Sequence, residues 1–492
     1  MATSSQAHAN GHGAHHPDVP EVNLTPQGVT EHLTRKVFTF DRALMVALLG
    51  LGVLVVLGIV GFVSRAVNDG FSDEARPQWG YYAAMFAFLL ATTGSAPVVA
   101  VAFRWTKSHW RRPLSRASEM FALVGVLNLL WFIPLMFLLP GIDLNHDGQL
   151  SVGQDRRTVW FEGPMGAPLW WDGFAVGFLV FCALAILWVS ARPDMSALGQ
   201  TGTGWRAALL RRLSMGWQGT EREWKLQRAS LGVLGAFYFM LLVFVHMLIS
   251  LDFSLSLVPG WKDSIFATHH ALTGLQAAGG TILVTLFIMR TWGGYRQYIG
   301  LDPFWSFSKV LLGLTLLWGY FWFSEFMTFW YGRDPTEQSV VKLIMFESYR
   351  TAFVLNLFFS FLIPFALLLW NGIRRSVLGP AVAGASAIIG AFFMMVRLYV
   401  PAFNIPQEDL GSHSIADFPV GAGGIAPQLL PVTPDVWDVF IVLGGLGATA
   451  FIYLLGTKLL PVMSMWETKE GLLYILVRPF MKGRYMVLGK PD

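Results

Sequence analysis

His246 and Asp252 stand six residues apart in the largely apolar stretch Phe244–His270. Imidazole and carboxylate groups are costly inside hydrocarbon, so membrane segments keep them mainly where they carry protons or bind a ligand. A carboxylate beside the imidazole would also favour its protonated form. The spacing therefore predicts proton-transfer chemistry at this pair and leaves the substrate open.

Two further ionisable residues lie within apolar segments. Glu325 stands in the sequence GYFWFSEFMTFWY, and an acid at such a depth costs roughly 2.5–3.5 kcal/mol on insertion scales. Tyr320 and Ser324 lie near it at helical spacing and are predicted hydrogen-bond donors. Arg397 and the histidines at 269–270 have a simpler interpretation, in which polar groups near helix ends reach the membrane interface. Carboxylates and imidazoles near one surface nevertheless favour proton-coupled chemistry.

The elements that must position these residues are membrane-spanning helices. Of the 492 residues, 54% are hydrophobic and 13% are charged, about half the charged fraction of a soluble protein. Ten segments reach the length of about 20 residues that a helix needs to cross the hydrocarbon. The chain is therefore predicted to be an all-α polytopic membrane protein that contacts lipid, and its net charge of +4 gives no reason to expect nucleic-acid binding. The predicted spans are 43–63, 81–103, 117–139, 173–190, 231–250, 266–289, 308–329, 352–370, 378–398 and 437–456.

Basic residues are concentrated in alternate connections between the spans. The connection after the second span, RWTKSHWRRPLSR, has five basic residues and no acidic one, and those after the fourth and eighth spans are also basic. Because Lys and Arg are enriched in cytoplasmic loops, both termini are predicted to be cytoplasmic. The ionisable residues of interest then lie toward the opposite, outer side: Asp172, His246, Asp252, Glu325 and Arg397.

The third connection contains a candidate calcium loop, DLNHDGQLSVGQD. Asp143, Asn145 and Asp147 occupy the first three ligand positions of such a loop, and Gly148 fits its sharp turn. The bidentate glutamate that would complete the loop is replaced by Gln154. The pattern is consistent with a Ca²⁺ site, and a hydrated, Asx-rich turn is the competing and simpler interpretation.

Cys182 is the only cysteine of the chain. This count excludes an intrachain disulfide, a covalently attached c-type haem and a cysteine-ligated iron–sulfur cluster, so the chain is expected to hold no redox metal of its own. A haem held by two histidines is disfavoured, because only His246 and the 269–270 pair could serve and all lie at the outer rim. Segment 1–41 contains five histidines. Such tails can bind metal, but a flexible cytoplasmic tail is the simpler prediction.

The surroundings of His246 resemble the NrfD/PsrC family, the quinone-interacting membrane subunits of modular oxidoreductases. The resemblance lies in a fifth span that ends His-x5-Asp-Phe and is followed by Pro259-Gly260-Trp261. The sequences PLWWDGFAVGFLVF (with Asp172), SARPDMSALG and GWQGTEREW, and the surroundings of Glu325, are also similar to that family. The resemblance covers roughly residues 80–480 and is strongest to the ActC and ActF subunits of bacterial alternative complex III.

This resemblance implies an architecture and a set of partners. The chain would be one subunit of a quinol:electron acceptor oxidoreductase in the bacterial inner membrane, and not an enzyme alone. Its partners would be an iron–sulfur subunit, a c-type cytochrome subunit and a second NrfD-like subunit, and the quinone (menaquinone or ubiquinone) would not be covalently bound. The implied divisions are a cytoplasmic tail 1–41, a flanking span 42–65, a four-helix bundle 80–252 with a periplasmic insertion 140–170, a second four-helix bundle 264–400, a periplasmic loop 401–435, a flanking span 436–458 and a cytoplasmic tail 459–492.

One motif of the quinol-oxidising members is missing. They carry His-x-Gly-Arg-Pro at the end of the third span, whereas this chain reads FIPLMFLLPGI at 132–142, with Met136 near the expected histidine. Either Asp172, His246 and Asp252 bind the quinone without that histidine, or the chain is a paralogous subunit without a quinone of its own.

If the chain is such a paralogue, it would provide a proton path or serve only as a scaffold. In the second bundle, Glu325 and Arg397 are the residues predicted to form a proton path. A secondary transporter is a further alternative. It is disfavoured because the polar residues lie near the outer rim and not at the bilayer midplane.

Overall fold

The described part of the chain is built mainly from long helices. The computed structural model describes residues 25–140, 168–406, 409–410, 412–420, 424–473, 475–480 and 483–488. Within these residues, 10 helices are long and apolar enough to cross a membrane, which confirms the predicted all-α polytopic class. The candidate calcium loop with Asp143, Asn145 and Asp147 lies outside the described residues, as do residues 1–24 of the predicted tail.

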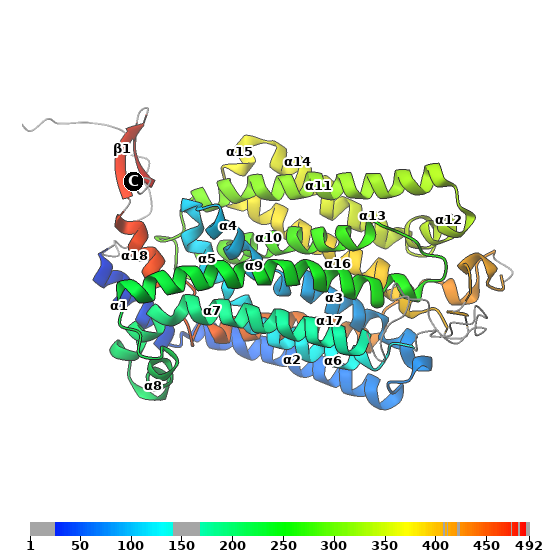
Figure 1. The fold of residues 1–492 in the computed structure, drawn as a ribbon, viewed down its shortest axis with the longest axis horizontal. Coiled ribbons are helices and arrows are strands. Elements are labelled where there is room, and N and C mark those ends of the chain that lie inside the picture. Colours follow the sequence, from blue (N-terminus) through cyan, green and yellow to red (C-terminus); the bar gives the residue numbers. More distant parts are fainter. Residues whose placement is uncertain are drawn as a thin grey trace, which may run out of the picture.

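The ten spans run along the long axis of the molecule (Figure 1), and several consist of more than one helical piece. Their pieces are α2 (Arg42–Asn68); η1 (Asp73–Trp79), α3 (Gly80–Leu89), η2 (Leu90–Gly94) and α4 (Pro97–Trp105); η3 (His109–Arg111), α5 (Arg112–Glu119) and α6 (Phe121–Met136); η4 (Pro168–Asp172) and α7 (Gly173–Thr201); α9 (Glu221–Asp252) and η5 (Leu255–Leu257); α10 (Phe266–Thr291); α11 (Asp302–Gly332); α13 (Arg350–Leu357), η7 (Phe358–Leu362) and α14 (Ile363–Leu369); α16 (Leu378–Phe403); and α17 (Val436–Gly456).

Shorter elements lie at the two ends of these spans. They are α1 (Pro26–Phe38), α8 (Gly204–Leu213), α12 (Pro335–Val341), η6 (Lys342–Phe346), α15 (Asn371–Arg374), η9 (Ile415–Asp417), η10 (Pro427–Leu429) and α18 (Met465–Leu473). The C-terminal segment adds an antiparallel hairpin of β1 (Ile475–Phe480) and β2 (Gly483–Leu488).

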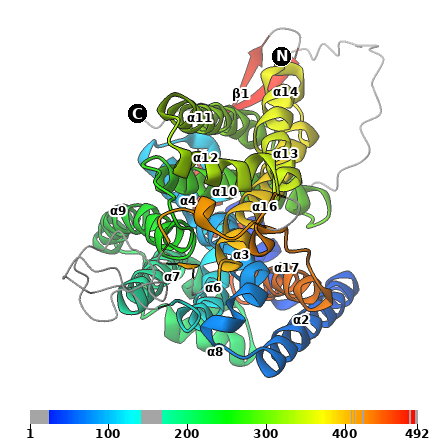
Figure 2. The same cartoon turned by 90° about the vertical axis from the view of Figure 1, so that its right-hand side faces the viewer.

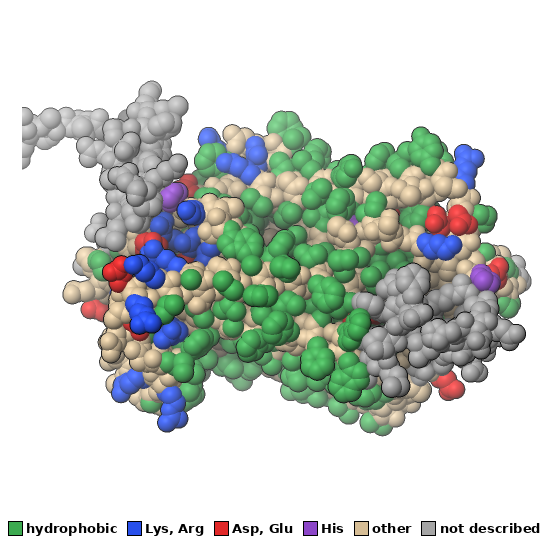
Figure 3. All heavy atoms as spheres, in the orientation of Figure 1, with side chains coloured by type: hydrophobic (Ala, Val, Ile, Leu, Met, Phe, Trp, Pro, Cys, Tyr) green, Lys and Arg blue, Asp and Glu red, His purple; other side chains and the backbone are tan. Residues whose placement is uncertain are grey.

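Side-chain types divide the molecule along its length. Hydrophobic side chains cover the middle, and Lys and Arg gather at the end that carries α1, α8 and α18 (Figure 3). We call this end the basic end and the opposite one, which carries α12, the α12 end. An apolar belt between two polar ends is the surface that a bilayer requires.

Contacts between the spans place α10 and α16 at the centre (Figure 2). Spans two to five contact one another in a ring, and spans six to nine do the same. The two rings meet where α10 packs against α9 and η2, and where α16 packs against α3. The first span, α2, packs mainly against α17, which in turn contacts α3 and α6.

Breaks in two of the spans free backbone carbonyls for side chains. The second span contains the π-helical segment η2, followed by Pro97, which cannot donate a backbone hydrogen bond. The hydroxyl of Ser95 bonds to the carbonyl of Leu90 beside this break, and the hydroxyl of Tyr238 bonds to that of Gly94. The eighth span has a similar break at η7, before Pro364. These breaks bring polar groups into the otherwise apolar interior.

Candidate functional site

Four buried side chains form a hydrogen-bonded chain between the two rings of helices. His246 Nε2 lies 2.9 Å from the Ser95 hydroxyl, and His246 Nδ1 lies 3.0 Å from His270 Nδ1. The other nitrogen of His270, Nε2, lies 3.0 Å from the Tyr399 hydroxyl. None of the four is more than 1% exposed. We call Ser95, His246, His270 and Tyr399 the histidine chain.

The histidine chain joins spans two, five, six and nine. An imidazole can donate through one nitrogen and accept through the other, so consecutive imidazoles can pass a proton along such a chain. Two nitrogens that bind a haem iron from opposite faces, at about 2 Å each, would lie about 4 Å apart, whereas the two Nδ1 atoms are only 3.0 Å apart. The arrangement suits proton transfer and not the haem alternative.

Gly274 makes the position of His246 possible. It lies one helical turn after His270 on α10, and a Cβ at this position would be 2.5 Å from His246 Nε2 and 3.2 Å from the Ser95 hydroxyl. Only glycine therefore lets the imidazole of α9 approach the backbone of α10 this closely.

The prediction that His246 pairs with Asp252 was wrong. The hydrogen bonds of His246 go to Ser95 and His270, and not to Asp252. Six residues along an α-helix correspond to a rotation of about 600°, so the two side chains point from α9 in directions roughly 120° apart. Asp252 is the last residue of α9 and is buried. Asp172 is also buried at the end of η4, which packs against α9.

A second group, which we call the acid cluster, consists of Asp263, His269, Glu325 and Arg397. His269 Nδ1 lies 3.0 Å from a Glu325 oxygen, and both side chains are almost fully buried. Asp263 and Arg397 both interact electrostatically with Glu325. Tyr320 and Ser324 do not bond to Glu325, contrary to expectation, because Glu325 turns toward α10 while Tyr320 is 63% exposed. Arg397 is 1% exposed, so the protein encloses its side chain and it does not extend outward to water.

Asp263 lies in the connection before α10, outside the spans. Its carboxylate accepts hydrogen bonds from the backbone N–H groups of Ile265 and Phe266 and so caps the start of α10. Burial and the negative charge of Glu325 raise the pKa of Asp263 to about 7. At neutral pH this carboxyl group is therefore poised to take up or release a proton.

Polar side chains continue from the acid cluster into the second ring of helices. The Thr273 hydroxyl donates to the carbonyl of His269 and accepts from Trp318 Nε1. One turn further, the Gln276 amide donates to Thr315 and to the carbonyl of Ser360. Beyond Gln276 the buried face of α10 is apolar, with Ala277, Ala278, Ile282, Leu283 and Leu286. This polar column therefore reaches from the α12 end only part of the way along α10.

Spans two, three and four of the first ring pack closely around a small space. A cavity there, lined by Thr93, Asn128 and Val176 among others, has a volume of 10 Å³. This volume is about that of one water probe. It cannot hold a quinone head.

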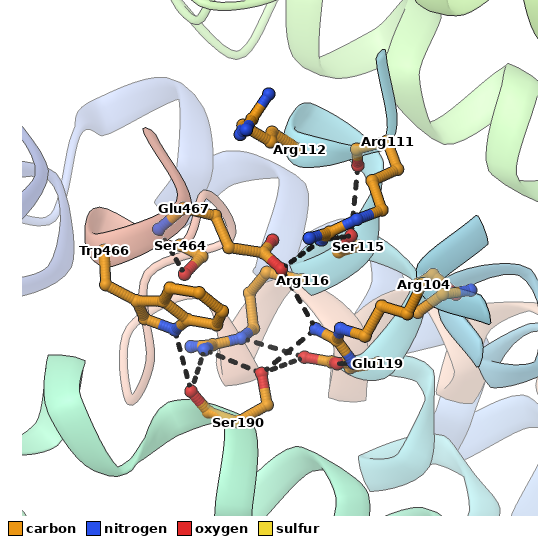
Figure 4. A network of polar contacts seen from close by, with 12 residues as sticks. Arg104, Arg111, Arg112, Ser115, Arg116, Glu119, Ser190, Ser464, Trp466 and Glu467 are labelled. Atoms are coloured by element: carbon orange, nitrogen blue, oxygen red, sulfur yellow. Dashed lines mark hydrogen bonds and ion pairs between the residues drawn. The ribbon is translucent and has the colours of Figure 1, made fainter. Parts of the chain in front are cut away.

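A third polar group, at the basic end, was not predicted. Arg104, Arg111 and Arg116 surround Glu119 and Glu467 (Figure 4). Arg111 lies 2.5 Å and Arg104 lies 3.3 Å from Glu467, and Arg104 also contacts Glu119. We call these five residues, together with Asp194, the ion network.

The ion network is balanced in charge and joins α18 to the bundle. Arg116 lies 3.2 Å from Glu119 and 3.0 Å from Asp194 on α7. Trp466 of α18 donates through Nε1 to the carbonyl of Ser190, 3.1 Å away. Three arginines face three carboxylates, which offsets the cost of burying each charge.

The sequence contained signals for this network. The five basic residues of RWTKSHWRRPLSR were used above only to predict the topology, and Glu119 follows three residues after the last of them. A carboxylate buried within a basic segment is a pairing signal. Its distant partners Asp194 and Glu467, however, become neighbours only through the fold.

No known protein family model matches the chain, and no characterised protein matches it in sequence. Within the parts of the chain that the structure describes, no three His, Cys, Asp or Glu side chains come together in an arrangement that could hold a metal ion. The candidate calcium ligands are outside those parts.

Proposed function

We propose that the chain is an NrfD-like membrane subunit of a quinol-oxidising complex and that its buried polar groups transfer protons toward the α12 end. The observation that carries this proposal is the acid cluster, in which Glu325 lies 3.0 Å from His269 within a span of a membrane protein. Such groups are retained in spans mainly where they have a function. The motifs around His246 and Asp172 supply the assignment to a quinol-oxidising complex.

In this proposal the α12 end faces the periplasm and the basic end faces the cytoplasm of a bacterial inner membrane. Oxidation of a quinol removes two electrons and two protons. The electrons would pass to an iron–sulfur subunit, because this chain has one cysteine and cannot ligate such a cluster by itself. The protons would pass through His269, Glu325 and Asp263 to the aqueous side.

Which subunit binds the quinone is the subject of a second proposal. Asp172 and Asp252 are buried, and η4 packs against α9, so a site near both carboxyl groups and His246 is consistent with the geometry. The missing His-x-Gly-Arg-Pro motif, with Met136 near the expected histidine, favours instead a paralogue that conducts protons beside a second, quinone-binding subunit. We therefore give the proton path precedence over quinol binding in this chain.

The first experiment is purification from native membranes in a mild detergent. Mass spectrometry identifies the subunits that copurify, and solvent extraction measures quinone per complex. An iron–sulfur subunit, a c-type cytochrome and a second NrfD-like chain are expected. If the chain purifies alone, the assignment to a complex is wrong, and transport assays become the next step.

Glu325→Gln tests the proton path in the assembled complex. The amide cannot bind the transferred proton, so quinol oxidation is expected to fall on the order of 100-fold, as for loss of a positioned proton-transfer group. Glu347→Gln is the matched control, since Glu347 is exposed near the α12 end. Normal turnover in a fully assembled Glu325→Gln complex would count against the proposal.

Asp252→Asn distinguishes the two assignments of the quinone. If this chain binds quinone beside Asp252, the variant assembles but binds quinone more weakly and oxidises quinol more slowly. If a second subunit binds it, the quinone content of the purified complex is unchanged.

A further inference from the structure

An open groove lies at the basic end between α2, α10 and α17. Its volume is 530 Å³, and its wall includes Ala47 of α2, Thr285 of α10 and Ala450 of α17. Lys36 and Lys458 line its mouth. We call it the lysine groove. It is remote from the histidine chain and the acid cluster, which lie toward the α12 end.

The walls of the groove face the region that lipid would occupy. Ala47 is exposed, and the most apolar part of α2 has none of its residues buried inside the protein. Trp292, which also lines the groove, is 74% exposed, and exposed tryptophans are typical of the membrane interface. The groove therefore has an apolar wall along the hydrocarbon and a basic mouth at the interface.

Cations outnumber anions at the mouth. Lys458 donates to the carbonyls of Lys36 and Thr39, 2.7 and 2.9 Å away, and Arg206 donates to the carbonyl of Lys458. Asp41 is the acid that lines the groove among these three cations. Burial lowers the pKa of Lys458. The positive charges of Lys36 and Arg206 lower this pKa as well, whereas Asp41 acts in the opposite direction. An anionic ligand would relieve this excess of positive charge.

Capping of α1 explains only one of the two lysines. Lys458 binds carbonyls at the end of α1, as basic residues near helix C-termini often do. Lys36 Nζ donates to a single carbonyl, that of Gly293, at 3.3 Å. Its ammonium group has three N–H donors, so it retains the capacity to bind oxygen atoms of a ligand.

A buried hydroxyl in the wall also lacks a partner. Thr449 lines the groove, and its hydroxyl oxygen is buried without a hydrogen-bond partner in the described part of the chain. Buried polar groups are nearly always hydrogen-bonded.

We propose that the lysine groove binds one anionic phospholipid, with its phosphate at Lys36 and Lys458 and an acyl chain between α2 and α17. Basic pockets between membrane helices bind anionic head groups in this way. A neutral quinone would fit the apolar wall but would not offset the excess of positive charge at the mouth. The lipid would also fill the space between α10 and the α2–α17 pair, and so hold that pair in place.

Native mass spectrometry of the purified, delipidated full-length protein tests this proposal. The protein is titrated with palmitoyl-oleoyl phosphatidylglycerol and, separately, with phosphatidylcholine that carries the same acyl chains. One phosphatidylglycerol is expected to bind in preference, and Lys36→Gln is expected to reduce its occupancy at least about fivefold through loss of a charged ligand. Lys309→Gln is the matched control, since Lys309 is exposed on α11 near the basic end.

A second pair of variants tests the wall of the groove. Ala47→Phe would fill the groove from an exposed position and is expected to reduce phosphatidylglycerol binding, whereas Val53→Phe, at an exposed position of α2 outside the groove, is not. Equal occupancy in Lys36→Gln and Lys309→Gln would overturn the proposal. So would equal binding of the two lipids, or binding of menaquinone in the groove without phosphatidylglycerol.

Discussion

Adjacent histidines on α10 serve different groups of residues. His269 contacts Glu325 of α11, whereas His270 contacts His246 of α9 and Tyr399 of α16. Neighbouring residues on a helix point about 100° apart, so a His-His pair at the start of a central helix can reach helices on two sides. The pair thereby places the acid cluster next to the histidine chain.

Gly274→Ala should break the histidine chain. The new Cβ would lie 2.5 Å from His246 Nε2, and the imidazole cannot move without losing its bond to Ser95 or His270. We expect a loss of about 1–3 kcal/mol in unfolding free energy, as for other overpacked interiors, seen as a lower Tm in detergent. Gly279→Ala is the control, because its Cβ would be 3.5 Å from Phe307, and its Tm should hold or rise. Equal Tm values for the two variants would contradict the close approach.

Asp263 should make stability depend on pH. Its carboxyl pKa is raised from 3.8 to about 7 by burial and by Glu325, so the folded state binds more protons than the unfolded state between these values. The stabilisation is therefore complete below about pH 4 and is lost as pH rises through about 7. Asp263→Asn should flatten the fall of Tm between pH 5 and pH 8, which thermal unfolding measures.

An exposed acid provides the comparison for this pH effect. Asp417 is exposed at the end of η9, and Asp417→Asn should leave the pH profile of the native protein unchanged. A profile that stays steep in Asp263→Asn would assign the pH dependence to other groups.

Sequence reasoning located the polar residues of the site but not their partners. The charge bias of the connections, together with the position of each residue in its span, predicted that His246, Glu325 and Arg397 lie at a similar depth on one side. In the structure all three lie toward the α12 end. Partner choice depends on the rotation of each helix about its axis. That rotation follows from packing, which is why Asp252 was wrongly predicted to pair with His246.

At the scale of elements, helix number and approximate limits were predictable because each span is a long apolar run. The breaks at η2 and η7, the helix α18 and the hairpin of β1 and β2 were not predicted. Pro97 and Pro364 marked the two breaks in the sequence. A proline within a span, however, can produce a kink, a π-turn or no change, and neighbouring side chains decide among these.

Glu467 should hold α18 against the bundle. Burial alone would raise the pKa of Glu467, but Arg111 and Arg104 outweigh it and lower the pKa. In Glu467→Gln these buried arginines lose a charged partner, which is strongly destabilising in buried pairs. We expect faster hydrogen–deuterium exchange in α18, measured by mass spectrometry, with little change in α12.

Glu470→Gln is the matched control for this prediction. Glu470 lies on the same helix but is 31% exposed, and it pairs with Arg112 at 3.5 Å, so its loss should change exchange little. If both variants exchange alike, the ion network does not anchor α18. Because the pKa of Glu467 is lowered, its contribution should be present above about pH 4.5 and disappear as the pH falls.

At the scale of the whole molecule, the charged groups are distributed unequally between the two ends. The basic end carries the ion network and the lysine groove, and the α12 end carries the acid cluster. In the proposed function, protons released through Asp263 would leave the cytoplasmic side only if the basic end is cytoplasmic. The proposed function and the orientation in the membrane are therefore linked.

Labelling of single cysteines tests the orientation. Cys182 is buried, so a Cys182→Ser protein offers a background without a native thiol. Lys262→Cys and Gln218→Cys place exposed thiols in the connections at the α12 end and the basic end, respectively. Since basic connections remain in the cytoplasm, a membrane-impermeant maleimide should label Lys262→Cys in intact cells and Gln218→Cys only after the membrane is opened. The reverse pattern would place the acid cluster toward the cytoplasm, where it would serve proton uptake, and would rule out outward proton release through Asp263.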